Sequence, residues 1–111
     1  SVVYAIFFGK AVKMALGYAH THAAKSELTL KTLSQWAKQL TGSRLLEQQV
    51  AAANTARHAF SYLYPEYPAV LEMVARNAQI NAMAFSGQAL DISVMIFDFN
   101  GGIAVSINET A

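Results

Sequence analysis

Apolar residues follow one pattern at the two ends of the chain and another in its middle. Residues 2–8 form a continuous apolar run, rich in β-branched and aromatic side chains, that ends at Gly9. Such a run is typical of a buried strand. In the middle, apolar residues recur every three or four positions, which indicates amphipathic helices. The predicted helices cover residues 10–25, 28–40, 44–63 and 68–85.

The breaks between these helices coincide with residues that favour helix ends. Gly42 suits the end of one helix and Ser43 the N-cap of the next. Pro65 cannot continue a helix, whereas Pro68 suits the first turn of the following one. Gly17 lies inside the first predicted helix and costs it about 1 kcal/mol relative to Ala. The apolar stripes predict the core residues of the second and third helices as Leu30, Leu33, Ala37 and Leu40, and as Leu45, Ala52, Ala56, Ala59 and Leu63.

A β-hairpin is the clearest local signal in the chain. Residues 92–99 and 103–107 are β-rich and flank Asn100-Gly101, a pair that favours tight turns. A two-residue loop puts Asp98 on the same face as Ile92, Val94, Ile96, Ile103, Val105 and Ile107. A three-residue loop turns Asp98 to solvent and brings Met95, Phe97 and Phe99 to the apolar face instead. Both registers are open, and we favour the three-residue loop because it keeps the carboxylate hydrated.

Together these elements predict an α+β domain. About four helices pack on a small antiparallel sheet made of the N-terminal strand and the C-terminal hairpin, and residues 1–111 form a single domain. The strand at residues 92–99 is apolar on both faces, which is typical of a strand covered twice. The second cover comes either from the protein's own helices or from another chain.

Composition and charge exclude several classes of protein. The chain has no cysteine, which rules out disulfides and zinc sites with thiolate ligands. No apolar run is long enough to cross a bilayer, and we expect a cytoplasmic protein. Only 14% of residues are charged, although 54% are hydrophobic. A chain with so few charges buries heavily, self-associates or keeps an apolar surface for a partner.

The residue types needed for catalysis do not form a recognisable motif. His20 and His22 are two residues apart, and His58 is distant, so none forms the i, i+4 pair of a helical zinc site. No serine lies in a nucleophile elbow. The Gly101-Gly102 pair lacks the spacing, the following helix and the lysine of a phosphate-binding loop. We therefore assign no catalytic residue, cofactor or metal, and expect that the protein is not an enzyme.

The basic residues favour an alternative, nucleic-acid binding. Six of the eight basic residues fall within residues 1–44, and residues 31–44 suggest a helix-turn-helix. Gly42 comes one place late for that motif, and Glu47 stands where a buried apolar residue is usual. The candidate contacts in this alternative are Lys10, Lys13, Lys31, Lys38 and Arg44.

An aromatic loop and the apolar strand favour protein binding instead. The candidate contact residues are Tyr62, Tyr64, Glu66 and Tyr67 in the loop, and Ile92, Val94 and Ile96 in the strand. The leading hypothesis is a non-catalytic protein-binding module, such as a small inhibitor, an immunity-type protein, an adaptor or a self-assembling subunit. Its partner is another protein or a second copy in a homodimer. The alternatives are a nucleic-acid-binding regulator and, third, a small enzyme or ligand-binding domain.

Overall fold

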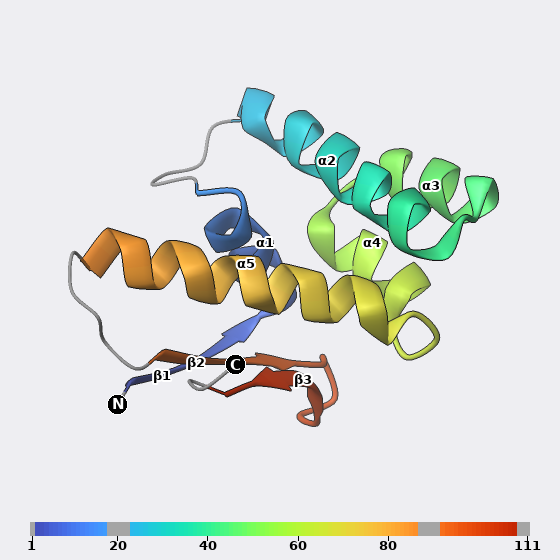
Figure 1. Ribbon diagram of the computed structural model, residues 1–111. Coiled ribbons are helices and arrows are strands. Elements are labelled where there is room, and N and C mark those ends of the chain that lie inside the picture. Colours follow the sequence, from blue (N-terminus) through green and yellow to red (C-terminus); the bar gives the residue numbers. More distant parts are fainter. Residues whose placement is uncertain (1, 18–22, 87–91, 109–111) are drawn as a thin grey trace.

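The computed structural model describes residues 2–17, 23–86 and 92–108, with the side chains of 23–28 and 85–86 left aside. Helices lie on one face of a small sheet, and α5 crosses that face directly (Figure 1). The elements, in chain order, are β1 (Val2–Phe7), α1 (Phe8–Ala15), α2 (Ala23–Thr41), α3 (Arg44–Ala51), α4 (Ala56–Leu63), α5 (Pro68–Ser86), β2 (Ile92–Phe97) and β3 (Ile103–Ile107). The prediction of an α+β fold is confirmed at this level.

The sheet is mixed, which corrects the prediction of an antiparallel one. Its strand order is β1-β2-β3, with β1 parallel to β2 and β2 antiparallel to β3. The parallel pair follows from the connection, because β1 leads into helices that cross above the sheet before the chain returns at β2. The N-terminal strand itself lies where the sequence predicts it.

The predicted helix at 44–63 is two helices, α3 and α4, so the described part of the chain has five helices rather than four. Thr55 is the N-cap of α4, and its Oγ1 accepts a hydrogen bond from the His58 backbone N–H at 3.0 Å. The Asn54 backbone N–H in turn donates to Nδ1 of His58 at 3.2 Å. These two bonds satisfy backbone donors at a break that the stripe of small residues concealed.

The first predicted helix ends early because Gly17 terminates it. Gly17 has a φ of +75°, and its N–H donates to the carbonyl of Met14 at 3.0 Å. Asn81 of α5 donates its Nδ2 to the carbonyls of Met14 and Ala15, at 2.9 and 2.8 Å, and so covers the end of α1. Residues 18–22 of the predicted helix lie outside the described residues, and α2 begins at Ala23.

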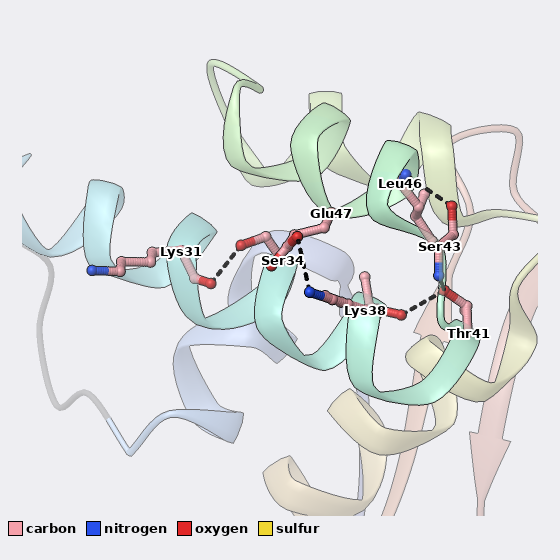
Figure 2. A network of polar contacts seen from close by, with 8 residues as sticks. Lys31, Ser34, Lys38, Thr41, Ser43, Leu46 and Glu47 are labelled. Carbon is pink, nitrogen blue, oxygen red and sulfur yellow. Dashed lines mark hydrogen bonds and ion pairs between the residues drawn. The ribbon is translucent and has the colours of Figure 1, made fainter.

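The corner between α2 and α3 explains two errors in the predicted core. Ser43 caps α3 by accepting a hydrogen bond from the Leu46 N–H at 3.0 Å, and its own N–H donates to Oγ1 of Thr41 (Figure 2). This cap sets the rotation of α3 so that Leu46 is buried and Leu45 is 65% exposed. Leu40, in the last turn of α2, is 42% exposed.

The hairpin register corrects the one that we favoured. Val94 pairs with Ile107 and Ile96 with Val105, as a two-residue loop requires, and a bulge then shifts Phe97 onto Ile103. The buried face of β2 is therefore that of Ile92, Val94 and Ile96, and α5 covers it. The favoured register failed because it assumed that Asp98 needs solvent, whereas its carboxylate binds the backbone of the turn.

Candidate functional site

Strands β1 and β2 end side by side, and the residues at their carboxyl ends meet the α4 helix and the loop after it. In open sheets with parallel strands, ligands usually bind beyond the carboxyl ends of the strands. Figure 1 shows the β2–β3 turn and the α4–α5 connection at the same end of the molecule. We call this group of side chains the carboxyl-edge cluster: Phe7, Arg57, Phe60, Tyr64, Asp98 and Phe99.

Phe99 is the centre of the carboxyl-edge cluster. Its ring stacks on Phe7 with centroids 5.4 Å apart and planes 9° apart, and it meets Phe60 edge-on at 5.4 Å. The guanidinium carbon of Arg57 lies 4.3 Å from the centroid of the same ring, within range of a cation–π interaction. Phe60 also stacks on Tyr64 at 5.3 Å. These contacts hold the ring of Phe99 between β1 and α4 and place an exposed guanidinium beside it.

Asp98 holds the turn that carries Phe99. Its Oδ1 accepts the backbone N–H groups of Asn100 and Gly102, both at 2.8 Å. These bonds lower the pKa of Asp98 below its usual range, the bond from Asn100 first, with a side-chain hydrogen bond from Tyr64 adding to the effect. The carboxylate is thus ionised at neutral pH and already occupied, so its role is to fix the turn rather than to accept a proton from a ligand.

Two helices begin near this edge and add positive electrostatic potential to it. A Cβ on Gly9 in α1 would lie 3.9 Å from the Cβ of Ala56 in α4, so the first turns of the two helices are neighbours. The first turn of α1 has no side-chain cap and no acidic residue. Lys10 and Arg57 directly follow Gly9 and Ala56 in the chain, and both are exposed. Helix N-termini and cations together favour anionic groups.

The three tyrosines of the predicted aromatic loop lie in three different environments. Tyr64 joins the carboxyl-edge cluster, and Tyr67 is half-buried against the core. Tyr62 turns instead toward His58, whose Nε2 lies 3.3 Å from the tyrosine hydroxyl. Because Nδ1 of His58 accepts a hydrogen bond from Asn54, a neutral His58 carries its proton on Nε2. Glu66 is exposed at the tip of the loop, apart from these contacts.

The predicted strand contacts are core residues. Ile92, Val94 and Ile96 are fully buried beneath the helices, so they are not available to a partner of the folded chain. This corrects their assignment as surface residues, and the register explains it, because they share the inner face of the sheet with Ile107. The opposite face of the same strand, with Ser93, Met95 and Phe97, is only half-buried.

The predicted nucleic-acid contacts are spread over three helices. Lys10 and Lys13 lie on α1, Lys31 and Lys38 on α2, and Arg44 opens α3. Nζ of Lys38 lies 4.0 Å from Oε1 of Glu47 across the α2–α3 corner (Figure 2), so this charge is partly balanced within the chain. Of these five residues, only Lys10 has a link to the carboxyl-edge cluster. It follows Gly9, which is a neighbour of Ala56, and Arg57 of the cluster follows Ala56.

Sequence reasoning missed five members of the cluster: Phe7, Arg57, Phe60, Asp98 and Phe99. The apolar pattern predicts Phe7 inside a buried strand and predicts Arg57 and Phe60 inside one continuous helix, although Asn54-Thr55 is a recognisable N-cap signal. Asp98 followed by Asn100-Gly101 is also a recognisable turn pattern, because Asp side chains bind backbone N–H groups two residues ahead. Those two local signals would have placed α4 and the turn at the correct residues.

Neither a metal-binding cluster nor a membrane-spanning helix occurs among the described residues. No group of three or more His, Asp or Glu side chains is arranged to hold a metal ion there. His20 and His22, which entered the prediction about zinc, lie outside the described ranges. Among the helices of residues 2–17, 23–86 and 92–108, none combines the length and the hydropathy of a membrane span.

Comparison with known proteins gives a consistent result. Residues 20–107 match the family described as CbiD, C-terminal domain. A cobalt-precorrin-5B C(1)-methyltransferase of Nitratidesulfovibrio vulgaris is 34% identical over 103 residues, which is 91% of this chain and 26% of the relative. The protein of the same name from Burkholderia thailandensis is 29% identical over 96 residues, 86% of this chain and 26% of its own. The chain thus spans about a quarter of these relatives, and no solved structure matches it.

These matches overturn the leading functional hypothesis. A non-catalytic inhibitor, immunity-type or adaptor protein is wrong, because the relatives are named as methyltransferases. The nucleic-acid-binding regulator fails for the same reason. The relatives are enzymes by name, and an enzyme is the third of the hypotheses that we draw from the sequence. The sequence carries no familiar catalytic motif, and the absence of such a motif does not exclude an enzyme.

Proposed function

The chain belongs to the CbiD C-terminal domain family, and from this we propose that it forms part of an enzyme that methylates cobalt-precorrin-5B at C1. The single observation that carries the proposal is the 34% identity over 91% of the chain to a methyltransferase of that name. Because the chain corresponds to 26% of that relative, the full reaction requires more of the enzyme than these 111 residues.

The carboxyl-edge cluster is the surface best suited to the substrate of such an enzyme. A cobalt-precorrin is a macrocycle with carboxylate side chains, so it offers both a flat face and negative charges. The cluster offers the exposed ring of Phe7 and the exposed guanidinium of Arg57. Guanidinium groups bind carboxylates through paired, charge-assisted hydrogen bonds, and aromatic rings stack on conjugated faces.

Each residue of the cluster then has a distinct task. Arg57 binds a substrate carboxylate, and Phe7 contacts the face or rim of the macrocycle. Phe99 positions Arg57 through the cation–π contact, and Phe60 holds Phe99 from its edge. Asp98 keeps the turn closed and thereby fixes Phe99. In this arrangement the domain binds and orients the substrate.

The experiment is a kinetic comparison in the full-length enzyme that carries this domain. We expect Arg57→Gln to raise KM for cobalt-precorrin-5B about tenfold or more, with kcat little changed, because a charge-assisted bond to the bound substrate is worth roughly 1.5–3 kcal/mol. Arg57→Lys should recover part of the loss. Arg76→Gln is the matched control, because Arg76 is an exposed arginine on α5 outside the cluster.

Two results would contradict these proposals separately. Wild-type enzyme that yields no C1-methylated product, analysed by mass spectrometry and NMR, would overturn the proposed reaction. An unchanged KM for Arg57→Gln in an active enzyme would leave the reaction standing and remove Arg57 from substrate binding.

A further inference from the structure

The sheet has a second face, and no described element covers it. This outer face is formed by side chains of all three strands that point away from the buried ones: Val3, Ala5, Phe7, Ser93, Met95, Phe97, Ile103 and Ser106. Val3 is 57% exposed and Phe7 is 55% exposed. The described helices pack on the opposite face, through α5. The outer face is therefore a surface in this chain, although its composition resembles that of an interior.

The outer face carries no charged side chain. Its members are apolar apart from two serines, whereas the exposed sides of α2 and α3 carry Lys31, Lys38 and Arg44. Solvent-facing sheets normally alternate apolar and polar residues across the pleat. An apolar face of this kind on an otherwise polar surface marks a contact with another protein surface.

Strand β1 extends the same surface to the edge of the sheet. β1 pairs with β2 on one side, and no described strand pairs with it on the other. Proteins usually protect such an edge with lysine, proline or a bulge. β1 has none of these, since its sequence is VVYAIF and its pairing with β2 is regular throughout. Val2 and Tyr4, on the inner side, are also exposed.

The comparisons indicate what lies against this surface. The relatives contain about four times as much chain as the segment that matches here. The family match covers residues 20–107, and the relative from Nitratidesulfovibrio vulgaris matches 91% of the chain, so its match extends into the residues before 20. Half of the large apolar residues that are exposed in the described part of the chain lie in β1: Val2, Val3, Tyr4 and Phe7.

We propose that the outer face of the sheet, together with the free edge of β1, is the surface on which the remaining part of the full-length enzyme packs. Phe7 belongs to both the outer face and the carboxyl-edge cluster. The packed part therefore also forms one wall beside the cluster, so that the substrate site lies at the junction between the two parts. Ligand sites are frequent at such junctions. The proposal depends on the family membership and not on the methyl-transfer reaction.

The absence of native cysteine from this chain allows a direct test by thiol labelling. In the full-length enzyme, Val3→Cys places a thiol on the outer face, and Gln35→Cys places one on the exposed side of α2 as a matched control. Each position is followed by its own peptide in mass spectrometry after a maleimide pulse. We expect the thiol at position 3 to react at least about tenfold more slowly than the thiol at position 35, because a packed surface is reached only through local opening.

Three outcomes decide the proposal. Slow labelling at position 3 that persists when the enzyme is monomeric by light scattering supports it. Equal labelling at the two positions overturns it. Protection that is lost when the enzyme is diluted from dimer to monomer also overturns it, and assigns the face to a second copy of the chain, as in the predicted homodimer. Assaying methyl transfer in the same samples tests the proposed reaction independently of these results.

Discussion

At the residue scale, the β2–β3 turn depends on the backbone conformation of Gly101. Its φ is +91°, in the left-handed region that side chains with a Cβ disfavour. We expect Gly101→Val to destabilise the protein by about 1–2 kcal/mol, because a β-branched residue is strained there even though the surrounding space is open. The measurement is the urea midpoint, followed by the fluorescence of Trp36, the sole tryptophan.

Gly9→Ala is the matched control for this strain. Gly9 does not have a positive φ, and its added Cβ would rest 3.9 Å from that of Ala56, an ordinary contact. Its stability should stay within a few tenths of a kcal/mol or rise slightly, because Ala favours the helix. Equal losses at the two positions would contradict the attribution of the Gly101→Val effect to the positive φ of Gly101.

The contribution of Asp98 to the stability of the protein depends on pH, and its lowered pKa determines the direction of that dependence. A group whose pKa is lower in the folded state stabilises the protein above its unfolded pKa, here 3.8, and loses that effect as the pH falls through the folded value. We expect Asp98→Asn to be less stable than the wild type near pH 7, with the difference shrinking below about pH 4. Urea midpoints at several pH values measure this difference. A difference in stability that does not change with pH would contradict its attribution to the ionised carboxylate of Asp98.

At the scale of the elements, local capping decides where the helices break. Thr55 caps α4 through the His58 N–H, and without this cap residues 44–63 read as one continuous stripe. We expect Thr55→Ala to cost about 1 kcal/mol, and Thr55→Ser to cost little, because serine keeps the hydroxyl acceptor. Thermal denaturation of both variants is the test, and equal melting temperatures for Thr55→Ala and the wild type would show that the cap is dispensable.

The elements that the sequence predicts well are those whose signals are local and strong. The last helix, predicted at 68–85, is observed at Pro68–Ser86, since Pro68 suits its first turn and the apolar period is regular. The two strands of the hairpin are observed close to their predicted limits. The predictions are wrong where two local signals compete. The apolar stripe predicts a helix that continues through Gly17, whereas Gly17 has a positive φ and ends α1.

The carboxyl-edge cluster could not be predicted in the same way, because its contacts join residues far apart in the chain. Phe7 stacks on Phe99 only because β1 and β2 end together, and that depends on their parallel pairing. The sequence predicts neither the direction of β1 nor the position of α4. An aromatic side chain at a strand end is equally compatible with core packing, so the cluster is recognisable only in three dimensions.

At the scale of the whole molecule, Gln79 joins the helical layer to the sheet. It is buried on α5, and its Nε2 donates to the backbone carbonyls of Ile92 at 2.7 Å and of Asn108 at 2.8 Å. The two acceptors lie in β2 and just after β3, so one amide fixes α5 against both strands of the hairpin. A Gln is costly to bury unless its amide is satisfied, which explains why this polar residue is tolerated in an apolar core.

Replacing Gln79 should therefore weaken the attachment of the two layers. We expect Gln79→Leu to lower the free energy of unfolding by about 1–3 kcal/mol, because two carbonyls lose their donor while the apolar volume is kept. Gln35→Leu, on the exposed side of α2, should change it by less than about 0.5 kcal/mol. Hydrogen exchange adds a spatial readout: the amides of β3 should lose protection in Gln79→Leu more than those of α2. A selective loss of protection in β3 would show that the hairpin opens from α5 on its own. An equal loss of protection in β3 and α2 would mean that the two layers unfold as one unit, so that the Gln79 amide contributes only to global stability.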